Sequence, residues 1–169
     1  TININEHAWR IIAGYGHTPE HAALYCADLG ILISGDQVLP RITTNVSVWP
    51  DQPDGDPLQR FFDSMQRYDD LPADTFVLPS HDRVFRGLRP RLAALRSHHA
   101  QRLAEVLAAC AQARTAAEIV PVLFKRQLDD HQFSFAIGET LAHLNHLWHQ
   151  GALQRLADAD GQYQFIAAP

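Results

Sequence analysis

Histidine and aspartate side chains stand at the ends of three short apolar runs in the first half of the sequence. His17 follows one run, Asp36 follows a second and His81 follows a third. Ligands gather at strand ends in α/β proteins, because the backbone direction brings side chains of neighbouring strands to one edge. Two imidazoles and a carboxylate suit Zn²⁺, which takes nitrogen and oxygen donors at about 2.0–2.2 Å.

A predicted helix after about Pro90 carries a second candidate group. His98 and Arg102 are four residues apart and therefore share one face, where the arginine could hold a substrate anion bidentately. A solvated helix face is the alternative. His99 falls in the apolar seam of the same helix, which favours a place in the core.

Three other patterns are open to both a functional and a structural interpretation. Six arginines lie between residues 83 and 102, which could form a patch for an anionic substrate or RNA, or a solvated face that balances nearby acids. His143, His146 and His149 recur every three residues, but such steps drift by about 60° each around a helix, which favours structural roles. Cys26 and Cys110 sit in apolar settings without basic neighbours, so no thiol nucleophile is expected.

The elements that must position these residues alternate between strands and helices. Asp56 and Pro57 predict the start of a helix after a long loop over 36–56, and a second helix is expected from about Pro90 to 110. Together with the strands this makes residues 1–114 an α/β unit. Four β-prone runs are expected to be strands: 9–12, 24–26, 31–33 and 75–79.

The sequence changes character after Arg114. Residues 115–118 form a capping box, which predicts a short helix to about residue 124, and Asp130 can cap a second helix that reaches His149. Asp160-Gly161 is a hairpin turn signal between two β-prone runs. These elements predict a winged-helix-like α+β domain over residues 115–169.

The chain resembles the C-terminal half of the metallo-β-lactamase-fold hydrolases. The resemblance is carried by Gly-His-Thr at 16–18, by Ser-Gly-Asp at 34–36 and by the final histidine at 81. It covers about residues 1–110, and the tail resembles the winged-helix extension of the lactamase-B2-like and hydroxyacylglutathione-hydrolase-like branch. It implies half of an αββα sandwich followed by the small winged-helix-like domain.

The resemblance also implies a dinuclear zinc site. His17 would bind the first zinc, Asp36 would bridge both ions and His81 would bind the second. His21 would support these ligands from behind them. Asp82 stands where the family commonly has glycine.

The same resemblance assigns further roles and shows one absence. His98 and Arg102 match a Ser-His-x-x-x-Arg pattern near the substrate cavity of that branch. The family's His-x-His-x-Asp-His signature is missing, since no His-x-His occurs in the 169 residues. We therefore expect Thr1 to lie in the middle of a larger protein, and expect this chain alone to bind zinc weakly and to hydrolyse nothing.

The whole protein would then be a hydrolase of esters, thioesters or related acyl bonds, acting through metal-bound hydroxide. A phosphodiesterase or endoribonuclease of the same fold is the first alternative, and a non-catalytic winged-helix interaction module is the second. DNA binding is disfavoured, because residues 115–169 carry three basic against six acidic residues. A half-fold should expose a sheet face, so we expect self-association or association with the missing N-terminal half.

Composition limits the remaining classes. The 169 residues have a formal net charge of −5 and are 46% hydrophobic, as in a soluble globular protein without attraction to nucleic acid or anionic membranes. No apolar run approaches the roughly 20 residues of a membrane span, and the N-terminus lacks the layout of a signal peptide. Two cysteines are too few for a disulfide scaffold, which predicts a cytoplasmic location.

Overall fold

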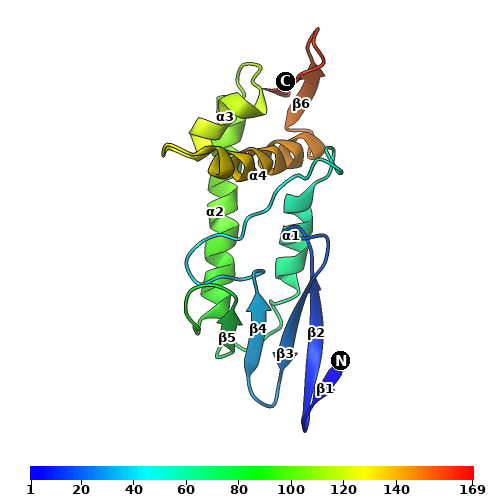
Figure 1. Cartoon of the computed structure of the whole chain (residues 1–169), viewed down its shortest axis with the longest axis vertical. Helices are drawn as coiled ribbons and strands as arrows, with labels where there is room; N and C mark the ends of the chain where they lie inside the picture. The colour runs from blue at the N-terminus through cyan, green and yellow to red at the C-terminus, as the bar shows by residue number, and fades with distance from the viewer. The chain divides into compact units, whose positions relative to one another are not determined.

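The computed structural model describes all 169 residues, which group into two compact units. Unit 1 contains residues 1–44 and 60–97, and unit 2 contains residues 45–59 and 98–169. The chain forms seven strands and four helices (Figure 1): β1 (Ile2–Ile4), β2 (His7–Gly14), β3 (His21–Cys26), β4 (Ile31–Gly35), α1 (Pro57–Gln66), β5 (Phe76–Pro79), α2 (Leu88–Ala109), α3 (Ala116–Leu123), α4 (Asp130–His149), β6 (Leu153–Ala157) and β7 (Tyr163–Ala167).

Unit 1 is built on a five-stranded sheet in the order β1-β2-β3-β4-β5. The first four strands are antiparallel neighbours, and β5 is parallel to β4. Side chains on one face are almost fully buried, because the alternation along each strand directs them to the core. This buried face carries Ile12, Ala23, Tyr25, Leu32 and Val77.

The opposite face of the sheet is also apolar but reaches the surface. The strand register aligns Ile11 with Leu24, Leu24 with Ile33 and Ile33 with Leu78 in one row across four strands. Ile11 and Ile33 are 45% and 38% exposed, and Ile4 of β1 is 45% exposed. Antiparallel sheets with one solvated face normally carry polar side chains there, so this face has the composition of a covered one.

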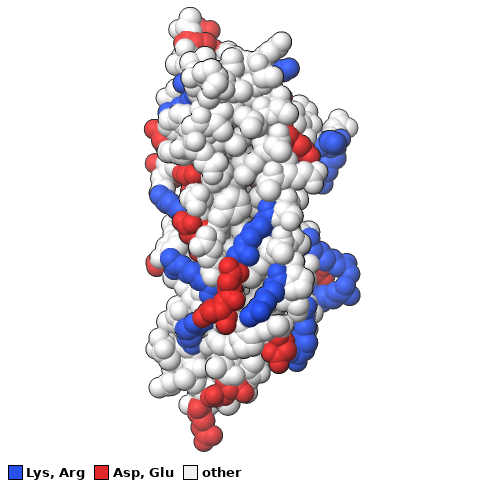
Figure 2. Space-filling model, turned by 180° about the vertical axis from the view of Figure 1, so that it is seen from behind, with Lys and Arg blue, Asp and Glu red and all other residues white.

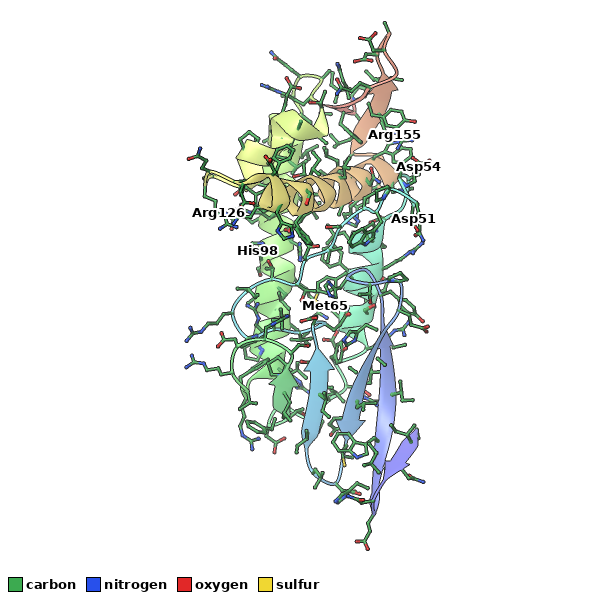
Figure 3. All side chains as sticks on the ribbon, in the orientation of Figure 1. Asp51, Asp54, Met65, His98, Arg126 and Arg155 are labelled. Atoms are coloured by element: carbon green, nitrogen blue, oxygen red, sulfur yellow. The ribbon has the colours of Figure 1, made fainter.

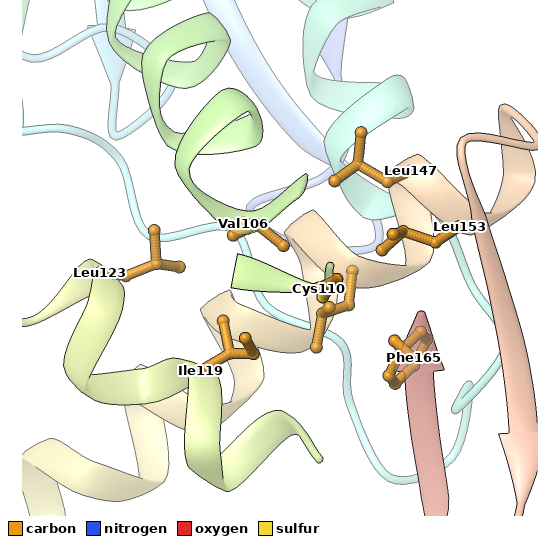
Figure 4. Packing of buried hydrophobic residues seen from close by; sticks show 8 residues of the cluster. Val106, Cys110, Ile119, Leu123, Leu147, Leu153 and Phe165 are labelled. Atoms are coloured by element: carbon orange, nitrogen blue, oxygen red, sulfur yellow. The ribbon is translucent and has the colours of Figure 1, made fainter. Parts of the chain in front are cut away.

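Unit 2 packs two helices and a β-ribbon around a small core. Thr115 and Glu118 form a complete capping box at the start of α3, and β6 and β7 form an antiparallel hairpin. α4 contacts both α3 and β6. The core, drawn in Figure 4, contains Val106, Cys110, Ile119, Leu123, Leu144, Leu147, Leu153 and Phe165.

Residues 45–59 run along α4 as part of unit 2. Val48 N–H donates to the Gly138 carbonyl at 3.0 Å. The Asn145 amide donates to the carbonyls of Pro53 and Gly55, both at 2.9 Å. The loop after Asp36 therefore ends in a segment whose path is fixed by polar groups of α4.

Most expectations for single elements are confirmed. The four predicted strands lie within observed ones apart from the edge residue 75, residues 36–56 contain no helix or strand, and α1 begins at Pro57 as expected. The N-cap of α4 was predicted at the wrong residue: Asp129 caps it by accepting from Gln132 N–H at 2.8 Å, because the capping oxygen must come from three residues before the free N–H. α2 begins at Leu88, with Pro90 in its first turn.

Two further expectations concern membrane-spanning helices and the C-terminal domain. None of the four helices combines the length and the hydropathy that a membrane crossing requires. The winged-helix assignment and the domain boundary after Arg114 stay predictions, since the compact units place residues 45–59 and 98–114 together with the C-terminal elements.

Candidate metal centre

Four candidate residues of unit 1 come from segments that meet at one end of the sheet, where β2, β4 and β5 end and β3 begins. His17 lies in the loop after β2 and His21 is the first residue of β3, whereas Asp36 and His81 follow β4 and β5. Because β3 is antiparallel to β4 and β5 is parallel to it, the start of β3 and the ends of β4 and β5 share that end of the sheet. The N–H of Ser80 donates to the Gly35 carbonyl at 3.1 Å and ties the two strand ends together.

Asp36 lies between two imidazoles. Its Oδ2 is 3.7 Å from His17 Nε2, and its Oδ1 is 3.2 Å from His81 Nε2. Two donors bound tetrahedrally to one zinc at about 2.0–2.2 Å lie about 3.4 Å apart. Each carboxylate oxygen is therefore near the spacing expected if it shared an ion with a different histidine, and these donor types fit zinc.

His21 lies directly over the backbone at the end of β4. A Cβ atom on Gly35 would come within 2.3 Å of His21 Nε2, and the φ of Gly35 is +54°, a conformation that favours glycine. Burial, followed by the nearby charge of His17, lowers the pKa of His21, against the opposing charge of Asp36. Its Nδ1 is buried without a hydrogen-bond partner. The environment of His21 thus favours the neutral imidazole, which packs on Gly35, the residue before Asp36.

The loop that carries Asp36 is held on both sides by hydrogen bonds. Ser34 Oγ–H donates to the Val38 carbonyl at 2.8 Å, and Thr44 Oγ1–H donates to the Asp36 carbonyl at 2.5 Å. The Arg91 guanidinium donates to the carbonyls of Leu39 and Ile42 at 2.5 and 2.6 Å. A ligand held by a fixed backbone keeps its orientation, which supports a metal site.

Asp82, which stands where the family commonly has glycine, has a backbone conformation that suits glycine. Its φ is +65°, so the backbone has the left-handed conformation that a glycine would adopt without strain. Aspartate tolerates this conformation better than most residues. The turn after His81 therefore has the geometry suited to glycine, and Arg41 Nε lies 3.5 Å from the Asp82 carboxylate.

His98 and Arg102 lie on α2 within unit 2. The Arg102 guanidinium donates to Glu105 at 2.9 Å and to the Leu123 carbonyl at 3.2 Å, which ties α2 to the end of α3. The Arg102 Nε is buried and has no hydrogen-bond partner. The ring of His98 makes an edge contact with the His99 ring. Their role toward a substrate stays a prediction.

His99 and His143 form a buried imidazole pair. His99 is 1% exposed, and its Nδ1 lies 3.3 Å from His143 Nε2. His143 Nδ1 lies 2.8 Å from the Glu139 carbonyl, which can only accept, so Nδ1 carries the proton and Nε2 accepts from His99. Burial, followed by the charge of His143, lowers the pKa of His99 to about 3. Both rings are neutral and belong to the interior of unit 2.

The other two histidines of α4 have separate partners. His146 Nδ1 lies 3.1 Å from the Asp56 carboxylate, and His149 Nε2 lies 2.8 Å from the Asp54 carbonyl. The three-residue spacing thus directs the imidazoles of α4 to different groups, as the helical drift predicts. His146 and His149 hold residues 45–59 against α4. The three histidines do not form a metal cluster.

Five of the six arginines between 83 and 102 contact other residues of the chain: Arg86, Arg89, Arg91, Arg96 and Arg102. Arg96 pairs with Asp69 at 2.9 Å, and Arg89 donates to the Leu71 carbonyl at 3.3 Å. Arg86 donates to the Asp74 carbonyl. Figure 2 shows basic side chains interspersed with acidic ones on the face that it presents. These contacts favour the balanced surface over a patch for RNA.

Sequence reasoning missed two groups. His7, Cys26 and Asp28 bring their ligand atoms within 4.8 Å of one another, at the end of the sheet where β3 ends and β4 begins, opposite to Asp36. Glu139 is partly buried on α4, where burial raises its pKa to about 7 and an Asn45 amide donates to it at 3.2 Å. Only the strand register and the tertiary packing bring these residues together, so no local pattern could reveal them.

Comparison with known proteins shows similarity to metallo-beta-lactamase proteins. Residues 1–81 match the metallo-beta-lactamase superfamily, and residues 103–168 match the metallo-beta-lactamase-like C-terminal domain. A beta-lactamase domain protein from Burkholderia ambifaria is 51% identical with a TM-score of 0.96, over 99% of this chain and 50% of that one. A metallo-beta-lactamase family protein from Thermus thermophilus is 31% identical with a TM-score of 0.85, over 98% and 51%. The chain spans about half the length of these two relatives, and no curated protein matches it.

Proposed function

Because residues 1–81 match the metallo-beta-lactamase superfamily and residues 103–168 match the metallo-beta-lactamase-like C-terminal domain, we propose that the chain belongs to this superfamily, whose members are typically metal-dependent hydrolases. In this proposal it supplies part of a zinc-dependent active site. The reaction would be the hydrolysis of esters, thioesters or related acyl bonds. The placement of Asp36 between His17 and His81 is the observation that carries this proposal.

Each of the three residues would offer a different donor atom to the metal. His17 and His81 each offer an imidazole Nε2, and Asp36 offers one oxygen to each side. When bound there, zinc would polarise a carbonyl oxygen and lower the pKa of a water molecule. His21 keeps Asp36 in place through its packing on Gly35, as residues behind metal ligands commonly do.

The inventory of ligands sets the expected strength of binding. The sequence has no His-x-His, so these three ligands would be shared between two ion positions. We therefore propose that the chain alone binds zinc weakly and has no hydrolytic activity. Activity would need further ligands from the half of the relatives that this chain does not match.

The finer assignments are proposals that rest on the resemblance. In the lactamase-B2-like and hydroxyacylglutathione-hydrolase-like branch with a C-terminal winged helix, His98 and Arg102 would contact an anionic part of the substrate. The Arg102 Nε, which has no hydrogen-bond partner, supports such a role. A reducing, cytoplasmic setting is supported by the two buried free cysteines, Cys26 and Cys110.

The exposed apolar face of the sheet supports a proposal about partners. We propose that the row of Ile11, Leu24, Ile33 and Leu78 packs against the N-terminal half of the longer protein, and that it mediates self-association when that half is absent. Burial of about 25 cal/mol per Å² of apolar surface would drive this contact. The proposal needs no contribution from DNA or membranes.

A substrate panel on a longer protein that includes the missing half tests the reaction. Zinc-dependent cleavage of thioesters or esters is expected, with a loss of roughly 100-fold or more in the Asp36→Ala variant. Glu20→Gln, on an exposed residue of the same loop region, is the matched control and should retain activity. Cleavage of RNA without cleavage of acyl substrates would contradict the proposal and favour a phosphodiesterase.

A further inference from the structure

Unit 2 contains a pocket of about 470 Å³ between residues 47–53, α4 and the β6–β7 ribbon. Its lining is almost entirely apolar. Trp49, Phe135 and Tyr163 line it while being 50%, 45% and 50% exposed. Large aromatic side chains that cluster around one open pocket are more typical of a binding site than of an ordinary protein surface. The volume lies within the range of about 300–1,000 Å³ that is typical of small-molecule sites.

The pocket wall opposite the ribbon is fixed in place. Val48 is bonded to the Gly138 carbonyl, and a Cβ on Gly138 would come within 2.9 Å of the Ser47 side chain. The absence of that Cβ lets residues 47 and 48 approach α4 closely. The hollow therefore has a backbone wall held by hydrogen bonds, as expected of a preformed site.

The only cation in the lining is already neutralised. Arg155 pairs with Asp54 at 2.6 Å, and its guanidinium stacks on the rings of Trp148 and Tyr163 at 3.9 and 4.2 Å. Figure 3 labels Arg155 on β6 and Asp54 close to it. A charged ligand would find no free counter-charge in this lining, so the pocket suits a neutral molecule.

Asn145 lines the pocket and carries one unused acceptor. The residue is 1% exposed, and its Nδ2 donates to two carbonyls, those of Pro53 and Gly55. This fixes the orientation of the amide, because both donor hydrogens are used and the oxygen must be Oδ1. The Oδ1 atom is buried and has no hydrogen-bond partner. A buried acceptor without a donor is costly, so a ligand that supplies an N–H or O–H is favoured there.

We propose that this pocket binds a neutral, mostly apolar small molecule that donates one hydrogen bond, from an N–H or a hydroxyl group, to Asn145 Oδ1. The aromatic side chains would enclose the apolar body of the ligand. The site is made only of residues of unit 2 and is independent of the proposed zinc site.

Indole and 1-methylindole form a matched pair of probes for this site. They share the aromatic body, but only indole has an N–H donor. Titration of the isotope-labelled chain followed by NMR should shift the signals of Trp49, Gly138 and Asn145. Indole should bind about five- to tenfold more tightly, the value of one neutral hydrogen bond, although 1-methylindole is the more apolar molecule. Equal affinities, or tighter binding of 1-methylindole, would overturn the assignment of Asn145.

Two tryptophan variants locate the binding. Ile137→Trp fills the pocket and should abolish the indole shifts, whereas Leu107→Trp, on an exposed position of α2 outside the pocket, should leave them unchanged. Equal binding by both variants would place indole elsewhere and contradict the proposal. If Ile137→Trp does not fold, the probe pair on the parent chain decides the question. Concentration-dependent broadening of the pocket signals without any probe would indicate a second copy as the occupant and would also overturn it.

Discussion

The imidazole of His21 packs on Gly35 so closely that no side chain fits between them: a Cβ on Gly35 would come within 2.3 Å of Nε2. Gly35 directly precedes Asp36, the proposed bridging ligand. Gly30 has the same left-handed type of backbone, with φ +63° against +54°, but nothing lies within 4 Å of the position of its Cβ. Alanine substitutions at the two glycines can therefore distinguish the effect of backbone strain from the effect of moving His21 and Asp36.

Substitution of these glycines tests whether the packing of His21 supports the site. Gly30→Ala should cost about 1–2 kcal/mol of stability, because it places a Cβ in left-handed backbone. Gly35→Ala should cost more, because its Cβ also meets the His21 ring. Only Gly35→Ala should push His21 away and tilt Asp36, and we expect it to weaken zinc binding by roughly tenfold or more in a calorimetric titration. Equal zinc affinities of the two variants would remove His21 from the support of the ligands.

The pH dependence of stability should carry the signature of Glu139. Burial raises its pKa from 4.5 to about 7 in the folded chain, so the folded state binds more protons than the unfolded state between these values. Stability should therefore fall as the pH rises from about 4.5 to 7. Glu139→Gln should raise the free energy of unfolding by about 1–3 kcal/mol relative to the parent above about pH 7, and by much less below about pH 4.5.

Chemical denaturation at a series of pH values measures this difference. Glu6→Gln, on an exposed residue before β2, is the control and should follow the parent chain at every pH. A Glu139→Gln profile parallel to that of the parent would show that the carboxyl titrates normally.

Gly138 should be required for the contact between α4 and residues 47–48. Alanine is the better helix former by about 1 kcal/mol, but its Cβ would lie 2.9 Å from the Ser47 side chain. We expect Gly138→Ala to destabilise the chain by about 1–2 kcal/mol in spite of its helix propensity. Adding Ser47→Gly should recover part of this loss in chemical denaturation, whereas a stabilising effect of Gly138→Ala alone would contradict the close approach.

The exposed sheet face should govern association of the chain. Ile11→Lys combined with Ile33→Lys places two charges in the apolar row and should lower the association measured by light scattering, because charged groups resist burial. Ile42→Lys is the matched control, since Ile42 is 60% exposed but lies in the loop after Asp36. A strictly monomeric parent chain at high concentration would refute the proposed role of the face.

The fold and the site could be predicted from the sequence to different extents. Apolar runs bounded by turn residues located four strands, and cap signals located the starts of α1 and α3, because these signals are local. Strand β1 was not predicted, since three residues show no period and its pairing depends on the turn at Asn5, whose φ is +53°.

The meeting of the three candidate ligands could be predicted from the sequence, whereas the packing that holds them in place could not. His17, Asp36 and His81 each follow a strand, so their meeting at one edge follows from topology. The packing of His21 on Gly35 depends on a backbone conformation that residue type only permits. The partly buried setting of Glu139 depends on residues 45–59 lying along α4, a placement that no sequence spacing indicates.

Titration of the chain with cobalt(II), followed by absorption spectroscopy, tests the central claim most directly, because cobalt reports its ligands by colour and binds the same kinds of site as zinc. We predict a spectrum without a thiolate-to-cobalt band, with binding that is lost in Asp36→Ala and retained in Asp28→Ala. A thiolate band that persists in Asp36→Ala and disappears in Asp28→Ala would place the metal at His7, Cys26 and Asp28 and contradict a centre built on Asp36.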